Sequence, residues 1–290
     1  MSERLEDLTE RVRGVGQLGV VVTAMRGIAA ARAQQSRGLL PGIQAYAGVI
    51  AQAVAQALRL MPAPPPSDGP AAPSSTMLVL FAAEHGFVGA FSDAVLDVAA
   101  RHAGEKTLFV VGARGARRAE ERGMKPDWQT HMAAHPGSVP ATAIRVAQAL
   151  YGQMNRVKPR RVAMIYPVWS AGAGLRVEQR MLMPIDYHQF APAPAADAPL
   201  VTLPPAVLLE RLADEYVFAQ LCEGTMHAFA AENEARALAM VRAKTNIEAM
   251  LTELQGEERR LRQEAITAEV IELAGATSSS RANARRRSRR

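Results

Sequence analysis

The chain has 290 residues, of which 49% are hydrophobic and 21% charged, so it can bury a core and is not disordered as a whole. Aromatic residues make up only 5%, and abundant alanine favours long helices over a β-sandwich or a barrel. The formal net charge of +6 belongs to the last ten residues, which contain six arginines and no acid. The rest of the chain is therefore neutral overall, and a basic folded surface for nucleic acid is not expected.

A single cysteine, Cys222, excludes an internal disulfide and is expected to be a buried structural thiol in a reducing compartment. No uninterrupted apolar run approaches the roughly 20 residues that span a bilayer. The amino terminus lacks the apolar segment of a signal peptide. These features predict a soluble, cytoplasm-type protein.

Residues 1–60 are predicted to form a coiled-coil helix, with a kink or break at the Pro-Gly pair 41–42. A second apolar stripe, Leu18, Val21, Met25 and Ile28, broadens its apolar face. The coiled-coil seam has mostly three- and four-residue spacing and contains Leu5, Leu8, Val12, Val15, Gly19, Val22 and Ala29.

The middle of the chain has a different texture and lies between two Pro-rich linkers, 61–75 and 191–204. Within 76–190, short apolar runs alternate with helical stretches, as in "TMLVLFA", "TLFVVGA" and "RRVAMIYP". This alternation predicts a small Rossmann-like α/β domain with a largely parallel sheet.

The scarcity of proline and glycine predicts a second long helix over residues 205–276. An Arg-rich tail, 277–290, follows it and is expected to be disordered. The apolar positions of this helix are sparse, so it can pack on one partner only, and the amino-terminal helix is the obvious one. The predicted fold is an α/β protein in which a long antiparallel two-helix coiled coil carries an inserted α/β domain. Two apolar lines lie along the second helix: Ile247, Leu251, Leu254 and Leu261, then Ile266, Val270 and Leu273.

Residues that could perform chemistry are few. The sequence contains no Walker A motif, no dinucleotide-binding glycine pattern after a strand and no zinc-type Cys/His spacing. The turn "AAEHGFVGAFSD" holds Gly86 and Gly89 and could bind an anion, although a plain tight turn is the preferred interpretation. Glu84 and His85 in this turn are the best acid–base pair for an enzyme, on weak grounds. We therefore expect no catalytic, cofactor-binding or metal-binding residues.

The Arg-rich tail leaves two interpretations open. It could bind nucleic acid or anionic lipid, or it could be a solvated extension that contacts an acidic neighbour. No aromatic residue is interleaved with the arginines, which argues against base stacking. A coiled-coil protein that binds nucleic acid through this tail is therefore one of the hypotheses for the function.

Three stretches carry a resemblance to a known family. "LTERVRGVGQLGVVVTAMRGIAAARAQQSR" is similar to its opening helix, "AAEHGFVGAFS" to a turn in its middle domain, and "AAENEARALAM" with "RQEAITAEVIELAGA" to its closing helix. The chain resembles the γ subunit of the F-type ATP synthase over residues 3–276. Thr23 and Arg259 depart from the family pattern, as does the Glu84–His85 pair, which suggests a divergent bacterial branch such as an alternative, sodium-type complex.

The resemblance implies a central rotor shaft that is not an enzyme by itself and needs no cofactor. One copy would turn inside a hexamer of α and β subunits, with the ε subunit and the membrane c-ring as further partners and no specific nucleic acid. The protein would then be a peripheral membrane protein on the cytoplasmic side of the bacterial inner membrane. By analogy, the residues expected to contact partner subunits are Met25, Arg32, Arg236, Arg262, Gln263, Thr267 and Glu269.

Overall fold

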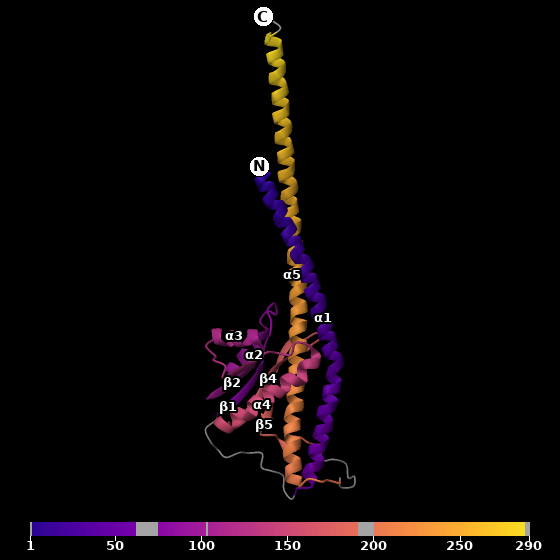
Figure 1. Ribbon diagram of the computed structural model, residues 1–290, viewed down its shortest axis with the longest axis vertical. Helices are drawn as coiled ribbons and strands as arrows, with labels where there is room; N and C mark the ends of the chain where they lie inside the picture. Colours follow the sequence, from indigo (N-terminus) through magenta and orange to yellow (C-terminus); the bar gives the residue numbers. More distant parts are fainter. Residues whose placement is uncertain (1, 62–74, 103, 191–199, 288–290) are drawn as a thin grey trace. The chain divides into compact units, whose positions relative to one another are not determined.

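The computed structural model describes residues 2–61, 75–102, 104–190 and 200–287, and for residues 2, 3 and 275–287 it describes the backbone alone. Two long helices, α1 (Ser2–Arg59) and α5 (Pro205–Arg287), are the first and last elements (Figure 1). The chain divides into two compact units. One unit holds α1 up to Arg26 together with α5 from Met240 onward, and the other holds everything between.

The α/β domain is built on a five-stranded sheet of order β3-β2-β1-β4-β5. The first four strands in this order are parallel, and β5 pairs antiparallel with β4, which confirms the largely parallel sheet. The short β3 was not expected. The strands are β1 (Thr76–Phe81), β2 (Lys106–Val111), β3 (Trp128–Thr130), β4 (Arg161–Ser170) and β5 (Gly174–Met183).

Helices cover both faces of this sheet, as the unbroken apolar run of β1 requires. Leu78 and Leu80 of β1 pack on one face among residues of α2 (Phe91–Ala100) and α3 (Ala113–Glu121). Alternate residues of β1 face the other way, toward α4 (Val139–Val157) and α5. Two short 3₁₀ helices, η1 (Pro136–Ser138) and η2 (Tyr187–Gln189), complete the domain.

Helix α5 packs closely on the sheet because its contact surface includes a glycine. A Cβ on Gly224 would lie 3.0 Å from Met164 Sδ and 3.5 Å from the Phe81 ring. Neighbouring α5 residues, among them Leu221 and Phe229, are buried in the same core as the sheet. The C-terminal helix is therefore part of the α/β core over this stretch.

Helix α1 runs antiparallel to α5 within this unit. Arg37 pairs with Glu234, and the Tyr46 hydroxyl donates to Glu215. Residue numbers therefore increase along α1 where they decrease along the adjacent part of α5. Leu40 packs against the domain core. These contacts account for the position of this part of α1 beside α5 in Figure 1.

The other unit is a two-helix coiled coil, also antiparallel. Leu8 of α1 is buried with Leu254 and Leu261 of α5. Thr9 donates a hydrogen bond of 3.2 Å to Glu258, whereas Gly19, further along α1, faces Ile247. The predicted seam and its partner are thus confirmed.

Two expectations about the helix ends and interiors are wrong. α1 continues through Pro41 as one helix, so the expected break does not occur, and Ser36 before it and Ile43 after it are both packed; the kink stays a prediction. The backbone of α5 stays helical to Arg287, where a disordered tail from 277 was expected. Alanine and arginine are strong helix formers, and no proline or glycine follows Gly275.

Most of both linkers lies outside the described residues. The predicted start of the second long helix at 205 is confirmed. By length and composition alone, one stretch within Arg4–Arg59 is apolar enough to cross a membrane, contrary to the expectation from the apolar runs. Such a signal is weak evidence by itself, and the seam of this helix packs on α5.

Candidate interaction surface

The turn after β1 is held by Glu84, which acts as a hydrogen-bond acceptor. Its carboxylate lies 2.7 Å from His131 Nδ1 and accepts the backbone N–H groups of Met132 at 2.8 Å and Ala113 at 3.0 Å. Burial raises the pKa of Glu84, but these hydrogen bonds outweigh it, so the net pKa is lowered. Glu84 therefore ties together the segments that follow β1, β2 and β3.

This geometry does not assemble the acid–base pair considered from the sequence. The Glu84 carboxylate is occupied by His131 and two backbone groups, and the backbone N–H of His85 donates to Glu232 of α5. Within the residues that the structure describes, no group of three or more His, Cys, Asp or Glu side chains could hold a metal ion. The turn is a structural junction.

Arg236 is placed differently from the expectation of a partner contact. It is 8% exposed, and its guanidinium bonds the carboxylate of Glu232 one turn earlier at 2.5 Å. Burial of a charged side chain is tolerated only with such a partner. Its charge is used inside the chain, so we remove Arg236 from the candidate contact residues. Glu232 itself was missed, although its four-residue spacing to Arg236 is a visible signal in the sequence.

The other candidates lie on helix surfaces. Met25 is half-buried and Arg32 is exposed, both on α1. Arg262 keeps 59% of its side chain exposed and pairs with Glu258 at 2.7 Å. The remaining three are exposed positions of α5: Gln263, Thr267 and Glu269.

Gln263 and Thr267 share one face of α5. Thr267 Oγ1 donates to the Gln263 carbonyl oxygen at 2.8 Å, and both residues lie on the same exposed face of α5 as Ile271. Residues three, four, seven and eight apart project from the same side of a helix, which explains this grouping. The structure therefore brings two of the predicted contact residues together beside an exposed apolar side chain.

Large apolar side chains remain exposed along both long helices. The second stripe of α1 does not join a core: Leu18, Val21 and Ile28 are each more than half exposed. On α5, the line Ile266, Val270 and Leu273 is equally exposed. Exposed apolar surface of this kind is typical of protein or membrane interaction sites and of ligand-binding grooves.

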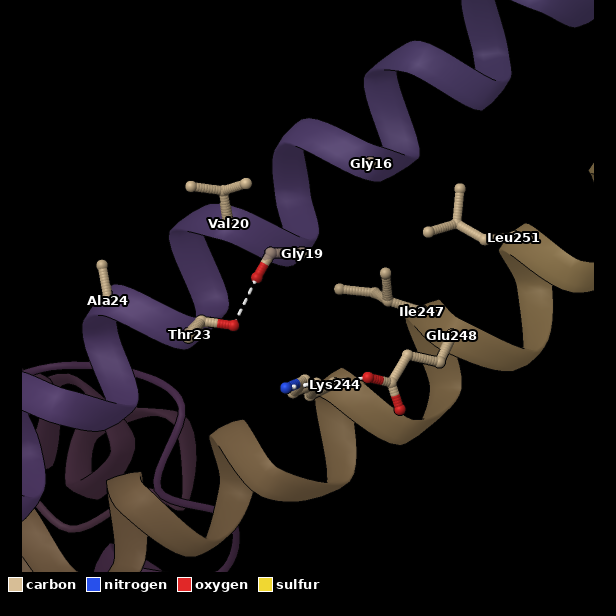
Figure 2. A pocket seen from close by; sticks show the side chains of 9 residues that line it. All are labelled: Gly16, Gly19, Val20, Thr23, Ala24, Lys244, Ile247, Glu248 and Leu251. Carbon is tan, nitrogen blue, oxygen red and sulfur yellow. Dashed lines mark hydrogen bonds and ion pairs between the residues drawn. The ribbon is translucent and has the colours of Figure 1, made fainter.

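Figure 2 shows a groove between α1 and α5 within the coiled-coil unit. Small residues of α1, including Gly16 and Gly19, face Ile247 and Leu251 across a gap that side chains do not fill. Thr23 Oγ1 bonds the Gly19 carbonyl oxygen at 2.8 Å. This stretch of the coiled coil is slender and loosely packed, and its surface is neither concave enough nor polar enough to suggest catalysis.

Comparisons with known proteins find similarity over nearly the whole chain. A family model described as ATP synthase matches residues 4–279. The ATP synthase gamma chain of Chlorobaculum tepidum is 25% identical, over 93% of this chain and 96% of that one. The gamma chain of Frankia casuarinae is also 25% identical, over 95% and 97%.

Solved structures share the fold. A chain of the mitochondrial ATP synthase of Euglena gracilis superposes with a TM-score of 0.68 at 13% identity, covering 98% of this chain and 96% of that chain. A chain from the central stalk and c-ring of the Tetrahymena thermophila enzyme gives a TM-score of 0.57 at 17% identity, over 77% and 99%. Both long helices and the intervening domain therefore occur together in known proteins.

Proposed function

The chain belongs to the ATP synthase family, and from this premise we propose that it is the γ subunit, the central stalk, of an F-type ATP synthase. The observation that carries the proposal is the match over nearly the whole chain to proteins named as gamma chains. The shared fold with chains of solved central stalks supports it.

The surface chemistry of the two helices suits a rotating shaft. A shaft inside a ring of subunits must be stiff, yet it must not bond strongly at one angle. An antiparallel coiled coil supplies stiffness along its seam at Leu8, Leu254 and Leu261. The exposed apolar rows can slide along an apolar inner surface of the ring, because hydrophobic contact has no preferred direction.

We expect the chain to be non-catalytic and to work by changing which catalytic interface of an α/β hexamer is open. The occupied carboxylate of Glu84 supports this view, since it leaves the best acid–base candidate without a reacting role. Rotation of an asymmetric shaft would couple ion flow to ATP synthesis or hydrolysis.

The proposed contacts with the hexamer are carried by exposed positions. The guanidinium of Arg262 is more than half exposed and bonds Glu258 through one of its nitrogens. Gln263 and Thr267 lie beside Ile271 on one exposed face of α5. The full proposed set is Met25, Arg32, Arg262, Gln263, Thr267 and Glu269.

The further proposed partners are the ε subunit and the membrane c-ring, with one copy of this chain in each complex. The c-ring named with the Euglena and Tetrahymena structures motivates this part of the proposal. The protein would then lie at the membrane surface, on the cytoplasmic side of a bacterial inner membrane. The alternative of a nucleic-acid-binding protein finds no support in the comparisons.

Co-expression with α and β subunits tests the proposal. The chain is expected to co-purify with them in a complex of fixed stoichiometry that hydrolyses ATP. A stable monomer that never joins such a complex would overturn it.

A matched pair of variants makes the test specific. Ile266→Ser removes an apolar side chain from the exposed row of α5 and is expected to weaken assembly or ATPase activity. Ile144→Ser, at a similarly exposed position of α4, should leave both unchanged. Equal effects of the two substitutions would contradict a role for the row on α5.

A further inference from the structure

A buried carboxylate of α5 holds the turn after β1. Glu232 is 3% exposed and accepts two successive backbone N–H groups, those of Glu84 and His85, each at 3.1 Å. Arg236 binds the same carboxylate at 2.5 Å from the next turn of the helix. All partners of Glu232 are therefore fixed by main chain or by its own helix.

The turn that Glu232 holds is itself joined to the rest of the sheet. Through its side chain, Glu84 binds Ala113 at the start of α3 and Met132 beyond β3. A displacement of Glu232 would therefore act on the segments after three strands at once. This makes the Glu84–Glu232 junction a link between helix α5 and the carboxyl ends of β1, β2 and β3.

The apolar packing of α5 fixes the rotation of the helix less specifically than the hydrogen bonds of Glu232 do. Phe229 and Leu221 bury apolar surface against the sheet, and Ala231 packs beside Phe91. Such contact contains no directed bonds, so it restrains rotation of the helix about its axis less sharply than hydrogen bonds do. Hydrogen bonds and a buried charge require one geometry and fix that rotation.

A second polar link exists, but it is less rigid. Arg180 of β5 reaches Glu223 of α5 at 2.5 Å and also bonds Gln220 of α5, through a long side chain that can change rotamer. The two backbone donors of the turn cannot turn away in this manner. Glu232 is thus the more demanding of the two restraints.

We propose that Glu232, held by Arg236, is a positioning residue that fixes the rotational setting of α5 in the α/β domain, so that torque passes between shaft and domain. The proposal rests on the function proposed above. In a rotary machine, slip at this junction would let ATP hydrolysis proceed while fewer ions are moved.

The test uses the assembled complex in membrane vesicles. Glu232→Gln leaves one amide oxygen for two backbone donors and leaves Arg236 buried without its carboxylate. We expect the variant complex to hydrolyse ATP but to move roughly twofold fewer ions per ATP, or fewer still. Amide hydrogen exchange at Glu84 and His85 should become faster in the same complex.

Arg236→Gln is the second variant, because it keeps the acceptor of the turn and removes only the group that holds it. It should lie between the parent and Glu232→Gln in ions moved per ATP. Glu121→Gln, which breaks the exposed pair with Arg118 on α3, is the control and should match the parent.

Unchanged ions per ATP in the assembled Glu232→Gln complex would overturn the inference, as would hydrolysis and pumping that fall in equal proportion. If Glu232→Gln does not assemble, an unchanged ratio in Arg236→Gln has the same meaning. Failure of the parent chain to join α and β subunits would instead contradict the proposed function, so the two failures are distinguishable.

Discussion

Helix α5 behaves differently in the two units that it enters. Beside the sheet it buries Leu221, Phe229 and their neighbours in the main core, and Gly224 brings it close to the strands. In the coiled-coil unit, Leu254 and Leu261 are buried with Leu8, while Ile266 and Val270 stay exposed. The first region is complete within the chain, and the second leaves apolar surface for another molecule.

In the proposed function, one helix is fixed to the α/β domain by buried contacts and presents an exposed surface to the hexamer. Buried apolar area supplies stability where the contact is permanent. Exposed rows contribute no such stability to the chain by itself. Substitutions should therefore affect stability in the sheet region and assembly in the coiled-coil region.

The largest effect is expected from Phe81→Ala in β1. Phe81 is fully buried, and loss of a core phenylalanine costs about 3–5 kcal/mol of unfolding free energy. Leu18→Ala on α1, at a position 57% exposed, should change it by less than about 0.5 kcal/mol. Urea unfolding of the purified chain measures both.

If Leu18→Ala destabilised the isolated chain as much as Phe81→Ala does, the proposed difference between the two regions would be wrong. A change only in the yield of complex with α and β subunits would support that difference.

A smaller, pH-dependent effect is expected at Glu223 in the sheet region. His227, whose Nε2 lies 3.8 Å from the carboxylate, is the largest cause that lowers the pKa of Glu223 to about 2; burial opposes it, and Arg180 at 2.5 Å adds to the lowering. A lowered pKa stabilises the fold above the ordinary value of 4.5, and this stabilisation is lost as the pH falls toward about 2. The contribution is on the order of 2 kcal/mol.

Urea unfolding of Glu223→Gln at several pH values checks this. The variant should be less stable than the parent near neutral pH, and the difference should shrink as the pH falls below 4.5. A difference that stays constant down to the acid limit would show that the charge of Glu223 does not stabilise this region.

A smaller effect than that at Glu223, and one of opposite sign, is expected from Gly16→Ala in the coiled-coil unit. A Cβ at this position meets no atom within 4 Å, and alanine favours a helix interior by about 1 kcal/mol over glycine. Gly112→Ala in the α/β domain is the contrast, since φ there is +119° and the new Cβ would lie 2.4 Å from the Ala82 carbonyl oxygen.

Thermal unfolding should place Gly16→Ala slightly above the parent and Gly112→Ala well below it. Destabilisation by Gly16→Ala would show that the gap in Figure 2 is filled within the chain.

Much of the fold followed from sequence patterns. The seam through Leu8 and Val12 and the helix start at Pro205 were predictable, because apolar spacing and proline placement act locally. The strand β3 was not, since "WQT" is too short and too polar to stand out. Its place depends on pairing with β2, which no local pattern encodes.

The candidate surface was less predictable. Arg236 matched the closing-helix pattern, yet its side chain is buried against Glu232. Sequence similarity identifies positions on a helix but does not determine which way a charged side chain faces. The junction at Glu84 required three segments distant in sequence, so only the folded structure could reveal it.

Observation of rotation tests the central claim most directly. With the α/β hexamer fixed to a surface, a probe is attached through Glu120→Cys, an exposed position of α3. Cys222 does not compete for the label, because it is 5% exposed and burial raises the pKa of its thiol to about 12. The account predicts that the probe turns in one direction while ATP is hydrolysed; a probe that stays fixed on an ATP-hydrolysing complex would contradict it.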